Sequence, residues 1–261
     1  GVPIGVVIMK AIIASEWLKA RTVRSHWVLI IIAMMFPLII STLVGILNPD
    51  PQYVSYREVV SIVASSGAFS LLLLSSLWVI NLTSEFTHGT IRVTYAAVPA
   101  RWKVIVSKAV IGTLVTAVVM TVLFWLNLGL GAALLNSRGA SIIVDGWFDH
   151  SFKVFVALVT FAIIVSWFGL GLGVLIKNSP VAIVVVLLWP LIIENLIALA
   201  LALSGYESAW KWMPYQTAFQ GIEGASGFDS ALSRPWGHLY FAAFVIVVGS
   251  IAVVADRRRD A

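Results

Sequence analysis

Residues 84–108 read SEFTHGTIRVTYAAVPARWKVIVSK, a segment with charged and polar side chains between two long hydrophobic runs, 60–82 and 109–135. A helix needs about 20 mainly apolar residues to cross the hydrocarbon core of a bilayer. Each of the two runs meets that length. The pattern therefore predicts two membrane spans joined by an ordered polar loop on one side of a membrane.

The composition of the whole chain favours the same environment. Of its 261 residues, 60% are hydrophobic and 11% are charged, whereas a soluble domain is about half apolar and about a quarter charged. There is no cysteine, which excludes disulfides and thiolate metal sites. We predict an all-α integral membrane fold forming a single transmembrane domain over residues 1–261. The hydrophobic runs predict six spans, at 27–47, 60–82, 109–135, 152–176, 181–203 and 236–255.

The distribution of Lys and Arg predicts the orientation. Six spans place both termini and the loop 83–108 on one side, and this side carries more basic residues than the other, which makes it cytoplasmic by the positive-inside rule. The segment 204–235 is then extracellular. The basic residues of the cytoplasmic side are Lys10, Lys19, Arg21, Arg24, Arg92, Arg101, Lys103, Lys108, Lys177, Arg257, Arg258 and Arg259, against Arg57, Arg138, Lys153, Lys211 and Arg234 on the other.

Two flanking segments complete the cytoplasmic side. Residues 1–26 include a helix-prone stretch in which Glu16 and Lys19 form a favourable i,i+3 pair. We expect a helix lying on the inner membrane surface, with a simple extension of the first span as an equal alternative. The C-terminal DRRRD, residues 256–260, is typical of a plain stop-transfer flank.

The loop 83–108 has internal order of its own. Gly89 is expected to break the helix that leaves the second span, and 90–97 can form two short turns of helix. Pro99 then ends the short helix, because proline disfavours helical geometry at the residue before it. Such an element is more ordered than a linker, which would be rich in Gly, Ser and charge. The alternative is an amphipathic loop that rests on lipid headgroups.

Three motifs carry a resemblance to a known family. SEWLKARTVRSHW precedes the first span, and EFTHGTIR and VPARWKVIVSK follow the second. In this order they resemble the permease subunits of ABC-2-type exporters, most nearly the actinobacterial permeases that have a separate ATPase. The resemblance covers the whole chain and implies that 83–108 carries the coupling helix that docks on the ATPase subunit. By resemblance, the coupling residues in or beside this helix are Glu85, Gly89, Thr90, Arg92 and Arg101.

The resemblance also implies partners and a location. It implies a second permease protomer, as a homodimer in preference to a heterodimer, in a bacterial plasma membrane with surrounding lipid. It implies ATP and Mg on the partner ATPase and no cofactor in this chain. It places short re-entrant helices in 204–235, although an ordinary aromatic belt, containing residues such as Tyr206, Trp212, Tyr215 and Phe228, is the favoured alternative there.

The chain lacks the motifs of an enzyme. No G-x-x-x-x-G-K-[ST] phosphate loop is present, so ATP hydrolysis has to come from another chain. GLGLG at 169–173 lies inside a hydrophobic run and predicts close helix packing through Gly169 and Gly173. The four histidines are scattered along the chain, and we expect no metal site, no catalytic residue and no nucleic-acid partner.

Glu194 is the exception within a predicted span. A central acidic side chain costs on the order of 3 kcal/mol on insertion scales, so it should face protein or water. One hypothesis assigns Glu194 and Asn195, with Ser75 and Ser76, to the substrate path. The alternative is a protonated or hydrogen-bonded packing residue at 194, and helix–helix hydrogen bonding is the favoured interpretation of both serines.

These observations predict a permease subunit of an ATP-driven exporter that moves an amphipathic or hydrophobic substrate out of the cell. Two alternatives remain. One is a secondary transporter that uses an ion gradient through Glu194. The other is a non-transporting subunit of a larger membrane complex.

Overall fold

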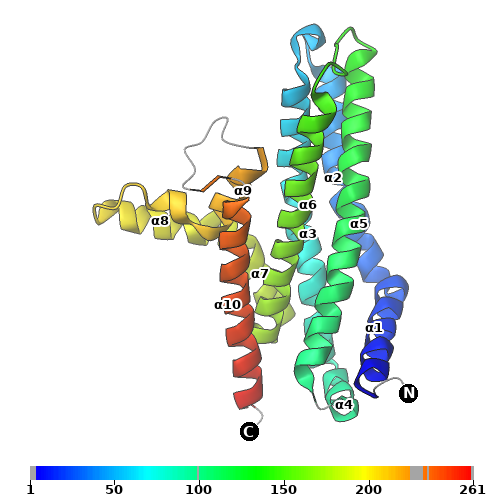
Figure 1. The fold of residues 1–261 in the computed structure, drawn as a ribbon, viewed down its shortest axis with the longest axis vertical. Helices are drawn as coiled ribbons and strands as arrows, with labels where there is room; N and C mark the ends of the chain where they lie inside the picture. The colour runs from blue at the N-terminus through cyan, green and yellow to red at the C-terminus, as the bar shows by residue number, and fades with distance from the viewer. Residues whose placement is uncertain (1–3, 99, 224–231, 234, 260–261) are drawn as a thin grey trace.

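Long helices packed side by side build the molecule. The short helix α4 (Thr90–Ala97), the start of α1 (Ile4–Thr22) and the end of α10 (Trp236–Arg259) lie at one end of the bundle, here called the α4 end (Figure 1). The computed structural model describes residues 4–98, 100–223, 232–233 and 235–259, and within these ranges all regular structure is helical. The elements are α1 (Ile4–Thr22), α2 (Arg24–Leu47), η1 (Pro51–Tyr53), α3 (Tyr56–Thr87), α4 (Thr90–Ala97), α5 (Arg101–Asn136), α6 (Trp147–Ile176), α7 (Ser179–Leu188), η2 (Trp189–Ile193), α8 (Glu194–Leu203), η3 (Ala209–Trp212), α9 (Pro214–Glu223) and α10 (Trp236–Arg259).

The predicted all-α fold with six spans is confirmed. Six helical segments among the described residues are long and apolar enough to cross a membrane. Several extend past the predicted hydrophobic runs, because polar residues at their ends continue the helix. The backbone N–H of Ser55 donates to Glu58 Oε2 at 2.8 Å, and the Ser55 hydroxyl accepts from the Glu58 N–H. This capping box begins α3 at Tyr56.

The centre of the bundle is the contact between α3 and α6. A Cβ at Gly169 would collide with Ser75 Oγ and lie 2.7 Å from the Ser75 carbonyl oxygen. A Cβ at Gly173 would lie 3.2 Å from Leu82 Cδ2. The two helices can therefore approach this closely only because these positions are glycine. The close packing predicted for GLGLG is confirmed.

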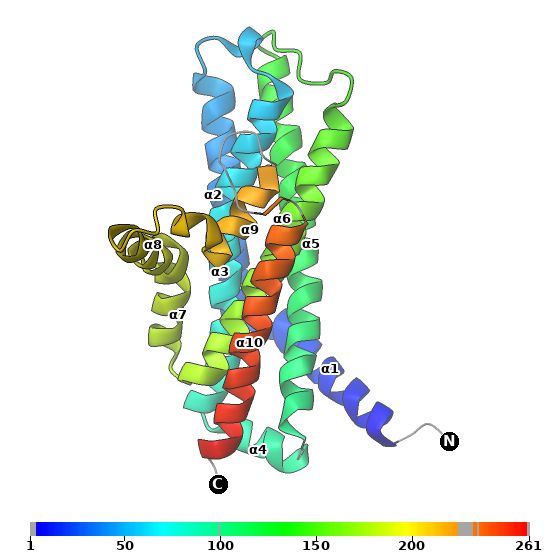
Figure 2. The ribbon, with the colours of Figure 1, turned by 60° about the vertical axis from the view of Figure 1, so that its left-hand side comes forward.

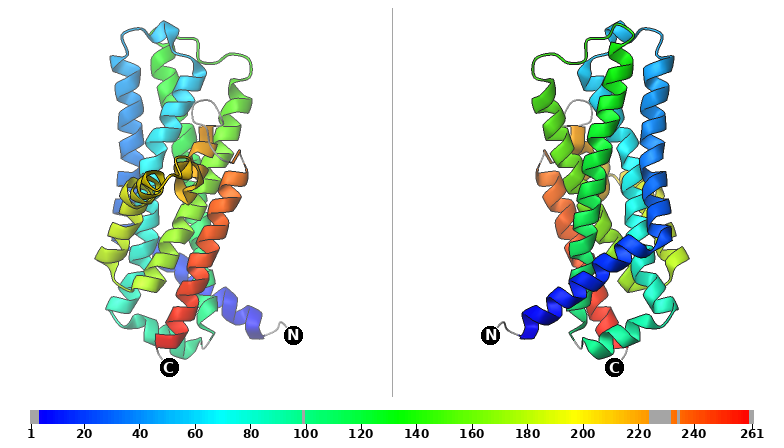
Figure 3. Two further views of the ribbon diagram at one scale, coloured as in Figure 1. Left: turned by 90° about the vertical axis from the view of Figure 1, so that its left-hand side faces the viewer. Right: turned by 90° about the vertical axis from the view of Figure 1, so that its right-hand side faces the viewer.

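A break at Val23 separates α1 from the first span. Val23 has extended backbone geometry, and α2 begins at the next residue. The indole N–H of Trp27 donates to the Arg21 carbonyl at 3.0 Å across the bend. As a result α1 slants away from α2 and crosses α5 (Figure 3). The simple extension of the first span is therefore wrong, because α1 is a separate helix. Its position on the inner membrane surface stays a prediction.

The fifth predicted span, 181–203, is broken in two. After α7 the chain forms the π-helical turn η2, which contains Pro190. Proline has no backbone N–H and its ring clashes with the preceding turn, so the regular hydrogen-bond ladder cannot continue. Beyond the turn, α8 points away from the bundle (Figures 1 and 2). The predicted fifth span is therefore present as the helical segment Ser179–Leu203, and it bends at the π-helical turn.

The described part of the segment 204–235 folds back beside the long helices. Its helix α9 packs on α6 and α10 at mid-height of the bundle (Figure 2). Tyr215 is buried, with its ring centroid 4.9 Å from that of Phe161 and 5.8 Å from that of Phe241. Tyr215 thus belongs to the core and not to an aromatic belt, whereas Tyr206 is exposed. The predicted belt residue Phe228 lies outside the described ranges.

The α3–α6 contact generates a stability prediction. Gly169→Ala should destabilise the protein by about 1–3 kcal/mol, because the added methyl group overpacks the contact. The measurement is the thermal unfolding midpoint of the detergent-purified protein. Gly129→Ala in α5 is the matched control, since a Cβ there meets nothing within 4 Å. Equal midpoints for the two variants would contradict the requirement for glycine at 169.

Candidate functional site

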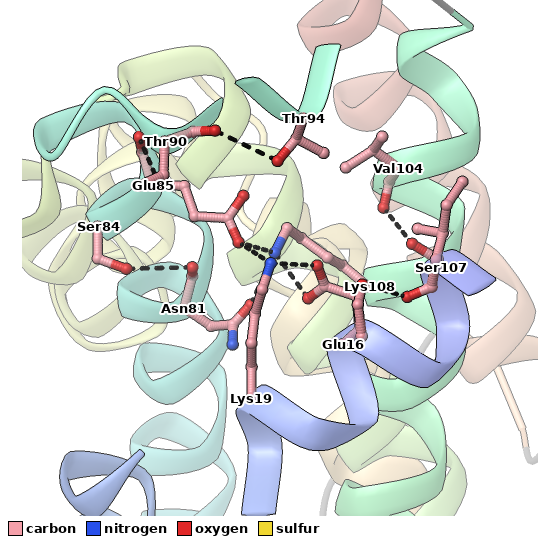
Figure 4. Close-up of polar contacts among 12 residues, drawn as sticks. Glu16, Lys19, Asn81, Ser84, Glu85, Thr90, Thr94, Val104, Ser107 and Lys108 are labelled. Atoms are coloured by element: carbon pink, nitrogen blue, oxygen red, sulfur yellow. Dashed lines mark hydrogen bonds and ion pairs between the residues drawn. The ribbon is translucent and has the colours of Figure 1, made fainter. Parts of the chain in front are cut away.

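A buried group of charged side chains joins α1, α3 and α5 (Figure 4). It consists of Glu16, Lys19, Glu85 and Lys108, here called the charge cluster. The Lys108 ammonium donates to Glu16 Oε2 at 2.7 Å, to Glu85 Oε1 at 2.7 Å and to Asn81 Oδ1 at 3.2 Å. An ammonium group has three N–H donors, so all of them are used. The side chain of Lys108 has no exposed surface.

Lys19 completes the charge cluster from α1. Its ammonium donates to Glu16 Oε1 at 2.8 Å and to Glu85 Oε1 at 2.7 Å. Burial lowers the pKa of Lys19, but its hydrogen bonds and ion pairs with the two carboxylates raise that pKa above its ordinary value. The cluster therefore holds two cations and two anions, and each buried charge has a partner of opposite sign. Buried charges without partners are strongly unfavourable, so α1, α3 and α5 stabilise one another here.

A second charged group surrounds Asp256, near the end of α10. The Asp256 carboxylate lies 2.7 Å from Lys177 Nζ and 3.8 Å from Arg101 Nη1, and the Tyr95 hydroxyl donates to it at 3.5 Å. Burial and the neighbouring carboxylate both raise the pKa of Tyr95, so the hydroxyl stays protonated. The interpretation of DRRRD as a plain stop-transfer flank is wrong for Asp256, because this residue ties α10 to α4 and α5.

The short helix α4 lies between these two groups of charges. Gly89 has φ +70°, a left-handed geometry that glycine adopts without strain, and this turns the chain at the end of α3. The helix then runs over Thr90–Ala97, as predicted. Ile91 is buried, whereas Arg92 is exposed and Val93 is 73% exposed. The inner face of α4 is thus fixed to the bundle and its outer face is open.

The five predicted coupling residues fall into two sets. Gly89, Thr90 and Arg92 lie together at the exposed start of α4. Arg101 is half-buried beside Asp256, and Glu85 is buried within the charge cluster. Glu85 therefore lies beneath the α4 surface, where it holds Lys19 and Lys108.

Glu194 binds the start of α9. Its carboxylate accepts hydrogen bonds from the indole N–H of Trp189 at 2.8 Å and from the backbone N–H groups of Tyr215 at 2.8 Å and Gln216 at 3.0 Å. The first N–H groups of a helix have no partner within the helix, and a carboxylate there is favoured by the helix dipole. Glu194 is 1% exposed. This geometry agrees with the alternative in which Glu194 is a hydrogen-bonded packing residue.

The other predicted substrate-path residues lie in separate contacts. Asn195 donates to the Leu191 carbonyl at 3.0 Å, within its own helical segment. Ser75 donates to Val165 O of α6 at 2.8 Å, and Ser76 donates to Leu72 O at 2.9 Å. Among the described residues, no hydrogen bond joins the two serines to Glu194 or Asn195. The favoured prediction of an interhelical hydrogen bond thus holds for Ser75. It is wrong for Ser76, whose hydroxyl bonds within α3.

Sequence reasoning missed the partners that build the two charged groups. Glu16 was identified only as a local partner of Lys19, and Lys108 and Lys177 only as topology signals. A charged residue on an otherwise apolar helix indicates that a partner exists. It does not indicate which distant residue that partner is.

Comparison of the chain with protein-family models and with curated proteins finds no match.

The charge cluster predicts a large cost for removing its central cation. Lys108→Met should destabilise the protein by about 3–5 kcal/mol, because two carboxylates would stay buried beside a single remaining cation. Lys153→Met removes an exposed ion pair with Asp149 and should cost at most about 1 kcal/mol. Chemical unfolding in detergent measures both values. A Lys108 variant as stable as the Lys153 variant would show that the cluster does not hold the helices.

The contact of Glu194 predicts a local effect. Glu194→Gln should weaken the anchoring of α9 by about 0.5–2 kcal/mol, the usual cost of losing a side-chain helix cap. Hydrogen exchange at the Tyr215 and Gln216 amides should then become faster. The exposed Glu207 provides a control, since Glu207→Gln leaves this carboxylate in place. Unchanged exchange in the Glu194 variant would argue against the capping role.

Proposed function

We propose that this chain is the membrane-spanning permease subunit of an ATP-driven exporter, and that a separate ATPase subunit docks on α4. Two observations together carry the proposal. The outer face of α4 is exposed, and buried ion pairs hold the helix ends next to α4 in place. A docking element has to present a surface to its partner. It also has to be tied firmly to the helices that the partner moves.

The two charged groups supply this connection. The charge cluster joins the end of α3, which leads into α4, to α1 and to α5. The Asp256 group joins α10 to Arg101, the first residue of α5 after α4, and to Tyr95 within α4. A displacement of α4 would therefore be transmitted to helices on both sides of it. This is the mechanical requirement for coupling ATP hydrolysis to the permease.

The partner would supply the nucleotide chemistry. ATP and Mg would bind to the ATPase subunit, because this chain has no phosphate-loop sequence. The α4 end would then face the cytoplasm of a bacterial cell, in agreement with the basic residues near it. Membership of the ABC-2-type permeases is part of this proposal and rests on the order of the sequence motifs and on the six candidate spans.

A second copy of the chain is also part of the proposal. The broken fifth segment exposes large apolar side chains along α8, including Leu196, Leu199 and Leu203. These side chains can contact lipid or another protomer. We propose that a homodimer encloses the path of an amphipathic or hydrophobic substrate, which leaves the cell.

The geometry of Glu194 gives little support to transport driven by an ion gradient. Three N–H donors already occupy its carboxylate, and the side chain faces α9. An ion relay needs a carboxylate that can release these partners and meet the ion. The proposal therefore rests on α4 and not on Glu194.

The test is purification of the tagged chain from native membranes, with mass spectrometry of the proteins that stay bound. Arg92→Glu reverses an exposed charge on α4 and should lower the yield of a phosphate-loop ATPase at least fivefold, an effect of about 1 kcal/mol or more. Glu85 is unsuitable for this purpose, because its replacement would break the charge cluster.

Arg57→Glu is the matched control, since Arg57 is also exposed but lies at the start of α3, at the opposite end of the bundle. It should retain the ATPase at the wild-type level. Equal retention by the Arg92 variant would remove α4 as the docking site. Absence of any ATPase from the wild-type sample would favour a non-transporting membrane subunit.

A further inference from the structure

A groove with apolar walls lies where α1 leaves the bundle. Its volume is about 440 Å³, which is within the range of pockets that hold small ligands. The helix α2 contributes Trp27, Ile30 and Met34 to one wall. The helix α1 separates from α2 at Val23 and crosses α5 (Figure 3). It contributes Trp17, Ala20 and Arg21 to the lining of the groove.

The facing wall comes from one stripe of α5. Leu114, Val118 and Val122 are spaced four residues apart and lie on the same face of the helix. All three are about half exposed, so they are not covered by the rest of the chain. The walls thus offer a continuous hydrocarbon surface between two candidate membrane spans, and the matching ligand chemistry is an extended hydrocarbon chain.

One positively charged side chain lies beside the groove. Arg21 and Trp17 of α1 are both among its lining residues, and Arg21 is exposed. The Arg21 guanidinium makes no ion pair with any described residue, in contrast to the paired Lys19 two positions earlier. Tryptophans favour the boundary between hydrocarbon and headgroups. Trp17 and Trp27 both line the groove, and the indole N–H of Trp27 donates to the Arg21 carbonyl. The groove therefore runs from a cationic boundary into the hydrocarbon layer.

We infer that this groove is a binding site for one anionic phospholipid. One acyl chain lies between α2 and α5, and the phosphate lies against Arg21. A guanidinium binds phosphate oxygens through paired hydrogen bonds. Net charge selects the occupant, because an anionic lipid is attracted to the basic side chain, whereas the cationic group of a zwitterionic headgroup offsets that attraction. The inference requires only that the chain resides in a bilayer and does not depend on the proposed ATPase.

The bound lipid would link α1 to the spans. The charge cluster fixes α1 to α3 and α5 on one side, and the acyl chain fills the space that α1 leaves beside α2. An anionic lipid would thus hold the angle of α1 relative to α2. It would also hold the position of Glu16, which binds Lys108.

The experiment is native mass spectrometry of the purified chain after equilibration in mixed micelles of phosphatidylglycerol and phosphatidylcholine with identical acyl chains. The wild type should retain one phosphatidylglycerol in preference to phosphatidylcholine. Arg21→Gln should lower this preference about fivefold, the factor expected when one basic side chain no longer attracts an anionic lipid. Arg57→Gln, which alters an exposed arginine far from the groove, should leave the preference unchanged.

A second pair of variants tests the hydrocarbon walls. Val118→Trp fills the groove and should reduce retention of both lipids. Leu126→Trp is its control, because Leu126 is similarly exposed on α5 but does not line the groove. Equal retention of the two lipids by the wild type, or an unchanged preference in the Arg21 variant, would overturn the inference. Lipid would then contact the groove without selection by headgroup. Arg21 is exposed, so its replacement should not prevent folding, and the unfolding midpoint checks this.

Discussion

The buried ammonium of Lys108 is the interaction on which the rest of the α4 end depends. Two carboxylates and one amide oxygen, all from α1 and α3, accept its three N–H groups. Without this cation, Glu16 and Glu85 would share one half-exposed lysine inside an apolar bundle. Because the acceptors belong to α1 and α3, one side chain of α5 fixes the positions of both helices relative to α5.

The apolar contacts and the charged contacts have different functions in this bundle. Glycines in α6 allow α3 to approach closely, and packed side chains such as Trp78 and Phe168 fill the centre. Such contacts give stability but little selection between alternative helix positions. The charge cluster and the Asp256 group add that selection near α4, since a displaced helix would leave a buried charge unpaired. The open outer face of α4 is therefore presented in a defined position.

Much of the fold could be predicted from the sequence, because span length, the Gly89 break and the 90–97 turns depend on local composition. The remaining features depend on which side chains meet in space. Glu194 is recognisable as an unusual charge, but its partners at 215 and 216 become visible only when α9 folds back. Similarly, a hydrophobic run such as 181–203 satisfies the length rule whether it is straight or broken at Pro190.

The charge cluster also has a consequence for the biogenesis of the protein. The ribosome synthesises its members in the order Glu16, Lys19, Glu85 and Lys108. A nascent chain in which only the first two spans have been synthesised therefore has two acidic members of the charge cluster and one basic member. Charge balance arrives only with the beginning of the third span. The first two spans are thus an incomplete folding unit, because the buried carboxylates of Glu16 and Glu85 obtain their second cation only from the third span.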